Sequence, residues 1–137
     1  MDVFVGEAKG LPIGQRDFFL EVLRQWCLTR REVRPVQPQL VQILAPFTCE
    51  LLAPVLDALF QTFEACLGRP MVSGHEKAMT ADELDLVALL NGSLSSSSRF
   101  PQSRTEVILQ VALCSTQVMV VMSRHPEGRS RGKTAWN

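Results

Sequence analysis

Apolar positions recur with helical periodicity along most of the chain. The first such pattern covers residues 15–31. Two further patterns cover residues 39–45 and 47–67, with Pro46 between them. Pro54 lies well inside the 47–67 pattern and lacks a backbone N–H, so we expect a kink or a local break there. In residues 15–31 the apolar side chains follow the i, i+3, i+4, i+7 spacing of an amphipathic helix, and they are Phe18, Phe19, Val22, Leu23, Trp26 and Cys27.

A capping box marks the start of the next helix. Thr80 is followed three residues later by Glu83. In this pattern the side chain of each residue accepts a hydrogen bond from the backbone N–H of the other. This helix is expected to end at Asn91-Gly92, because glycine favours the left-handed conformation that ends helices. Five serines in residues 93–98 then predict a solvated loop with a mobile tip.

Ser103 followed by Glu106 has the form of a second capping box and predicts a last helix over residues 104–124. The β-branched residues within 118–121 could instead form a strand, but a periodic pattern this long favours a helix. The helix has one polar stripe of Glu106, Gln110 and Gln117, and its apolar residues lie broadly opposite this stripe: Val107, Ile108, Val111, Cys114, Val118, Met119 and Met122.

These patterns predict an all-α fold, a compact bundle of about five helices. The long apolar helix of residues 47–67 is expected at its centre, since the segment between Pro35 and Gly68 has no lysine or arginine and needs to be almost surrounded by protein. Its acids, Glu50, Asp57 and Glu64, recur every seven residues and predict a narrow solvated face.

A chain of 137 residues suits one domain with a sizeable core. We expect an N-terminal arm over residues 1–14, a single helical domain over 15–124 and a disordered basic tail over 125–137. The 14 basic and 14 acidic residues cancel, so no global field favours nucleic acid as the main partner. The N-terminus has no apolar segment typical of a signal peptide, and no stretch reads as a membrane span, so we expect a cytoplasmic protein without a membrane partner.

Metal and nucleotide chemistry find little support in the sequence. His75-Glu76 begins like the zinc motif H-E-x-x-H, but Met79 stands where the second histidine is needed. Residues 128–134 resemble a phosphate-binding loop, yet three residues separate its glycines instead of four and no helix can follow. We therefore expect no metal and no cofactor. The cysteines have no C-x-x-C spacing and are expected to be buried reduced thiols, namely Cys27, Cys49, Cys66 and Cys114.

The order of helices, and most specifically Thr80-Ala81-Asp82-Glu83-Leu84 with the apolar residues that follow, resembles a family of small bacterial proteins of unknown function. The resemblance covers about residues 17–123. It implies an all-helical fold and brings no catalytic residues with it.

Three functions remain open. The first is a non-enzymatic interaction or regulatory protein, acting as a homodimer through apolar surface of the central and last helices. The second is a bundle that binds an apolar small molecule among Phe60, Phe63, Met119 and Met122, where the alternative is that these residues fill the core. The third is an enzyme that uses His75 with an acidic partner, such as Glu76, Asp82 or Asp85, although no catalytic residue can be assigned from sequence alone.

Overall fold

The computed structural model describes residues 16–123, and within that range it is helical and has no β-strand. Five helices of nine residues or more confirm the expected all-α bundle. The predicted arm over residues 1–14 and the predicted disordered tail over 125–137 lie outside the described residues. The elements are α1 (Arg16–Arg31), α2 (Val36–Leu44), the 3-10 turn η2 (Ala45–Phe47), α3 (Leu52–Leu67), α4 (Ala81–Asn91), the single-turn α5 (Ser96–Arg99) and α6 (Glu106–Ser123).

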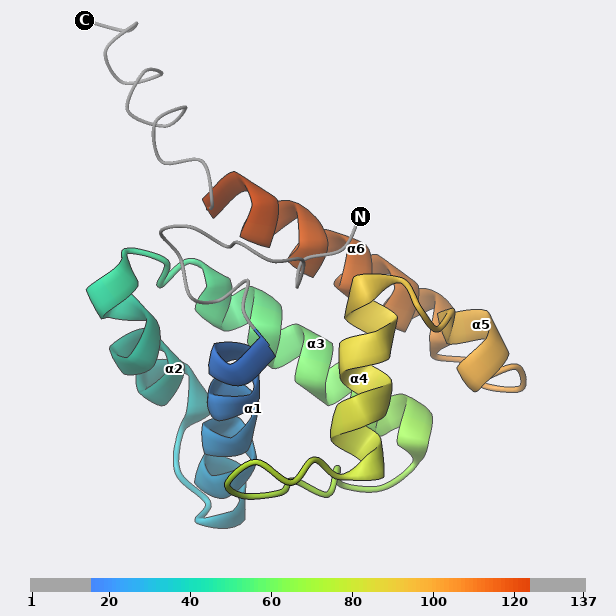
Figure 1. Ribbon diagram of the computed structural model, residues 1–137, viewed down its shortest axis with the longest axis horizontal. Helices are drawn as coiled ribbons and strands as arrows, with labels where there is room; N and C mark the ends of the chain where they lie inside the picture. The colour runs from blue at the N-terminus through green and yellow to red at the C-terminus, as the bar shows by residue number, and fades with distance from the viewer. Residues whose placement is uncertain (1–15, 124–137) are drawn as a thin grey trace, which may run out of the picture.

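Helix α3 is the central element of the bundle. It packs against α2 on one side and α6 on the other, and α1 and α4 complete the assembly around it (Figure 1). Its inward side chains have no exposed surface, which confirms that this apolar segment lies at the centre. They are Leu52, Ala53, Leu56, Leu59, Phe60 and Phe63.

The chain breaks before Pro54 instead of bending at it. The predicted helix over 47–67 is interrupted after η2, where Thr48 has the left-handed φ of 54°, and α3 begins only at Leu52. Pro54 is therefore the third residue of α3, in the first turn, where a backbone N–H has no helical partner to lose. The predicted kink or local break is thus present as a break at Thr48, before α3, and not at Pro54 itself.

Helix α2 begins at Val36, three residues before the predicted start at residue 39. Pro35 precedes it with an extended ψ of 131°, and Pro38 falls in its first turn. Both prolines are tolerated because the first N–H groups of a helix are unpaired in any case.

The serine-rich segment is more ordered than expected. Residues 96–99 form α5, and the side chain of Ser95 caps this turn by accepting a hydrogen bond from Ser98 N. Ser96 is buried and donates its hydroxyl proton to the carboxylate of Glu106. The predicted solvated loop is thus a capped helical turn attached to the start of α6, because serine hydroxyls can replace backbone partners at helix ends.

Helix α6 begins at Glu106, and the second capping box is not formed. Ser103 N donates to Phe100 O at 3.2 Å, and the Glu106 carboxylate is engaged by Ser96. Ser103 Oγ accepts instead from Thr105 N at 3.2 Å. Residues 118–121 are helical, so the strand alternative is excluded.

Candidate functional site

Two adjacent carboxylates at the start of α4 organise the connection between α3 and α4, residues 68–80. Asp82 and Glu83 are 3% and 0% exposed. The first capping box is confirmed, since Glu83 N donates to Thr80 Oγ1 at 3.1 Å and Thr80 N donates to Glu83 Oε1 at 3.0 Å. The Thr80 hydroxyl also donates to Val72 O at 2.7 Å, so the helix start holds the preceding loop.

Glu83 joins α4 to α1 through Arg24. Arg24 Nε donates to Glu83 Oε2 at 2.8 Å and Nη2 donates to Oε1 at 3.0 Å. Gly74 N adds a bond to Oε2 at 2.9 Å. Burial by itself would raise the pKa of Glu83, but the arginine and the backbone N–H donors outweigh it and leave the pKa below its ordinary value.

Asp82 holds the other end of the connection. Arg69 Nη1 donates to Asp82 Oδ2 at 2.7 Å and Nη2 donates to Oδ1 at 2.9 Å, while Val72 N donates to Oδ2 at 2.8 Å. The hydrogen bonds from Arg69 lower the pKa of Asp82 despite its burial. Two successive residues thus bind two arginines and three backbone N–H groups of the 68–80 connection.

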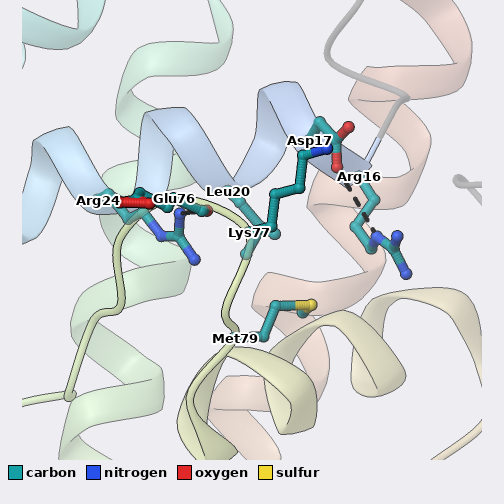
Figure 2. A pocket seen from close by; sticks show the side chains of 7 residues that line it. All are labelled: Arg16, Asp17, Leu20, Arg24, Glu76, Lys77 and Met79. Carbon is teal, nitrogen blue, oxygen red and sulfur yellow. Dashed lines mark hydrogen bonds and ion pairs between the residues drawn. The ribbon is translucent and has the colours of Figure 1, made fainter.

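Arg24 lies between two adjoining pockets of about 460 and 490 Å³. Both are bounded by Asp17 and Glu76 as well as Arg24, and Figure 2 shows the first of them between α1 and the 76–79 segment. Two further donors of Arg24 bind Glu76 O at 2.7 Å and Ala78 O at 3.0 Å. Most of the guanidinium donors are therefore used within the protein, and the arginine positions the loop instead of offering an anion site.

His75 and Glu76, the predicted functional loop, are both exposed at the second pocket. His75 forms an isolated β-bridge with Ala78, which orders the tip of the loop. The acids considered as its partners are engaged elsewhere, because Asp82 binds Arg69 and Asp85 accepts from Arg99 Nε at 2.7 Å. Of the acids considered, only the adjacent Glu76 is not paired with an arginine.

The predicted apolar ligand site separates into core and surface. Phe60 and Phe63 have no exposed surface. The Phe60 ring packs edge-on against Phe19 and Trp26 at centroid distances of 5.8 and 5.3 Å, and Phe63 packs against Phe100 at 5.9 Å. Aromatic pairs at these distances are typical of a filled core.

The methionines of the predicted ligand site lie differently from its phenylalanines. Met119 is half-buried against the core, and Met122 is 56% exposed. The four residues therefore do not share one buried environment.

The acids Glu50, Asp57 and Glu64 were expected to form a solvated face, and this was wrong for two of them. Asp57 is half-buried and accepts from Trp26 Nε1 at 2.8 Å and from Gln37 Nε2 at 2.7 Å. Glu64 is half-buried too, and its carboxylate accepts from the backbone N–H of Met71 at 2.9 Å. Only the third acid, Glu50, is exposed.

The four cysteines also differ in their exposure to solvent. Cys27 and Cys49 are buried as expected, Cys66 is half-buried, and Cys114 is exposed, which corrects the expectation for that residue. Burial, with the nearby Glu64 charge, raises the pKa of the Cys27 thiol to about 11, so it stays protonated. Within residues 16–123 no three side chains of the His, Cys, Asp and Glu types come together as metal ligands.

The most extensive exposed apolar surface described in the structure lies on α6. The helix turns Leu109, Leu113, Thr116 and Val120 inward. A second apolar face of the helix points to solvent, with Val107 63%, Val111 60% and Val118 56% exposed. We call this face the α6 stripe; it consists of Val107, Ile108, Val111, Cys114, Val118, Val121 and Met122, all exposed except the half-buried Val121.

The sequence alone does not show this orientation, because α6 is apolar on two faces and periodicity does not say which of them turns inward. Leu51, just before the start of α3, is another exposed large apolar side chain, at 76%. Helices α3 and α6 run in opposite directions past each other (Figure 1), and Cys66 Sγ near the end of α3 lies 3.2 Å from Thr105 Oγ1, just before α6.

Comparisons of the chain with protein-family models, curated proteins and solved structures gave no match. The resemblance drawn from Thr80–Leu84 to a family of small bacterial helical proteins therefore stays a prediction. Among the helices of residues 16–123, none has both the length and the apolar character needed to cross a membrane.

Proposed function

We propose that this protein is a non-enzymatic interaction module that acts as a homodimer, with the α6 stripe as its interface. The observation that carries the proposal is the exposure of five large apolar side chains on one helix: Val107, Ile108, Val111, Val118 and Met122. Contiguous exposed apolar surface of this kind marks interaction sites in soluble proteins.

The spacing within the stripe supports a helical partner. Val107, Val111, Cys114, Val118 and Val121 follow one another at steps of four, three, four and three residues. This alternation keeps a seam on one side of a helix and is the spacing by which two helices pack together. The expected occupant is therefore another helix that presents the same kind of surface.

The absence of charge supports a second copy of the chain as that occupant. No Lys, Arg, Asp or Glu occurs between Val107 and Ser123. An uncharged apolar face is complementary to itself, as the isologous interface of a two-fold dimer requires. A surface that binds anionic lipid would carry lysine or arginine along its edges, and α6 has neither.

The test is the mass of the protein in solution, measured by size exclusion with light scattering over a series of concentrations. The wild type is expected at twice the chain mass of 15.3 kDa. Val111→Glu combined with Val118→Glu is expected to give monomers, because two carboxylates would enter the interface without partners. The matched control is Leu84→Glu, which adds a charge at an exposed apolar position of α4 and should leave the dimer intact.

Circular dichroism of each variant verifies that the helices are retained. A wild type that stays monomeric at every concentration would overturn the proposal. The proposal would also be overturned if the variant that combines Val111→Glu with Val118→Glu remained a dimer.

A further inference from the structure

We infer that the two α6 helices of the dimer pair antiparallel, with the two-fold axis passing close to Cys114. This inference rests on the proposed function and specifies its geometry. It places the two Cys114 thiols near each other and brings Val107 of each chain opposite Val121 of the second copy.

The centre of the stripe lies at Cys114. The five seam positions run from Val107 to Val121, and Cys114 is seven residues from each end. A two-fold axis perpendicular to a helix reverses the direction of its copy, and the overlap of the two seams is largest when the axis meets the middle of the seam. Any displacement of the axis along α6 leaves valines at one end uncovered on both chains.

Side-chain size supports a crossing at the same place. Cys114 is a small exposed residue in the middle of the stripe, between Val111 and Val118, and the adjacent Ser115 is also small and exposed. Packed helices cross at an angle, so their axes are nearest at one point and diverge beyond it. Small side chains at the crossing and larger ones toward the ends fit that shape.

The charge that follows α6 in the sequence favours the antiparallel arrangement over the parallel one. The segment that follows Ser123, residues 124–137, contains four basic residues and one acidic residue. Parallel pairing would start both of these segments at the same point of the dimer. Antiparallel pairing starts them about 27 Å apart, the length of an 18-residue helix, which is several times the screening length of about 8 Å at physiological salt. The helix dipoles also oppose each other favourably in the antiparallel arrangement.

The first test uses the native cysteines. Of the four in the chain, only Cys114 is exposed. Wild-type protein treated with a short bis-maleimide is expected to give a covalent dimer whose linked peptides both contain Cys114, identified by mass spectrometry. Cys114→Ser, which keeps the other three cysteines, is expected to lose this product while remaining a dimer by light scattering. A protein that is dimeric but forms no Cys114 to Cys114 link would overturn the inference and leave the proposed function standing.

The second test reads the direction of the helices, in the Cys114→Ser background. Val107→Cys and Val121→Cys are prepared as separate proteins. Antiparallel pairing predicts that a mixture of the two cross-links, whereas Val107→Cys alone does not, because its two copies lie about 21 Å apart along the helix. Parallel pairing predicts the reverse, a strong link in Val107→Cys alone, and that result would overturn the inference. A monomeric wild type would remove the proposed function itself, so the two failures are distinguishable.

Discussion

Arg24 on α1 and Glu83 in the first turn of α4 meet in a two-point ion pair, with Arg24 Nε 2.8 Å from Glu83 Oε2 and Nη2 3.0 Å from Oε1. The pair joins residues 59 positions apart in the chain. The Glu83 side chain is completely buried and that of Arg24 is 18% exposed. The same carboxylate caps its own helix and binds the backbone of Gly74, so it fixes α1, α4 and the connecting loop together.

Removing this carboxylate should destabilise the protein strongly. Glu83→Ala leaves Arg24 and two backbone N–H groups without their acceptor, and we expect the free energy of unfolding to fall by about 3 kcal/mol, as for other broken buried pairs. Urea unfolding followed by circular dichroism measures this change. The matched control is Asp17→Ala, whose contact with Arg16 is long, at 4.0 Å, and exposed; its effect should stay below about 0.5 kcal/mol. Equal effects of the two substitutions would contradict the importance assigned to Glu83.

Acid should weaken the protein through Asp82 and Glu83. Both carboxyls have pKa values in the folded state below their ordinary values of 3.8 and 4.5. The unfolded chain therefore binds more protons in this range, and stability rises with pH. The contribution is fully present above about pH 5 and is lost as the pH falls through the folded-state pKa values.

Urea unfolding repeated from pH 7 down to pH 3 measures this dependence. Glu83→Gln removes one of the two titrating groups and should flatten the acid slope. An identical slope in the variant and the wild type would show that other groups govern the acid transition.

Asp57 is expected to matter for the core in a way that its neighbouring acid does not. Asp57→Ala leaves the indole N–H of the fully buried Trp26 without its acceptor, and this should cost about 1–3 kcal/mol. Tryptophan fluorescence reports the altered indole environment, and chemical unfolding gives the energy. Glu50→Ala, seven residues earlier and exposed, is the control and should have little effect on either measurement. If Asp57→Ala changed neither the fluorescence nor the free energy of unfolding, Trp26 would have found another acceptor.

Substitutions at two glycines distinguish the effect of steric crowding from that of backbone conformation. A Cβ added at Gly74 would lie 2.6 Å from the backbone oxygen of Ala78, so Gly74→Ala must displace the loop from Glu83. Gly92 has a left-handed φ of 85° and open space around it. Gly92→Ala should therefore cost only about 1 kcal/mol of conformational strain.

For Gly74→Ala we expect a larger loss, toward the upper end of the roughly 1–3 kcal/mol found for overpacked sites. Thermal unfolding of both variants compares them directly. A larger loss of stability in Gly92→Ala than in Gly74→Ala would contradict steric crowding at Gly74.

Local rules in the sequence determined the helices and one of their starts. Thr80 and Glu83 form the predicted capping box because its partners lie within one turn of each other. The same rule failed at Ser103, since a distant residue, Ser96, engages the Glu106 side chain that the box required. The break predicted at Pro54 lies instead at the turn of Thr48, and Pro54 falls in the first turn of α3.

What the sequence by itself determined is the all-α class and the central position of the apolar segment that ends at Leu67, because periodicity and charge spacing are properties of neighbouring residues. Only the tertiary structure decided which apolar face of α6 turns inward: Leu109 and Leu113 are buried, whereas Val107 and Val111 are exposed. It also decided that Asp57 accepts from Trp26 instead of facing water. Both outcomes depend on side chains brought from other helices, and a helical pattern read along one segment contains no information about what packs against it.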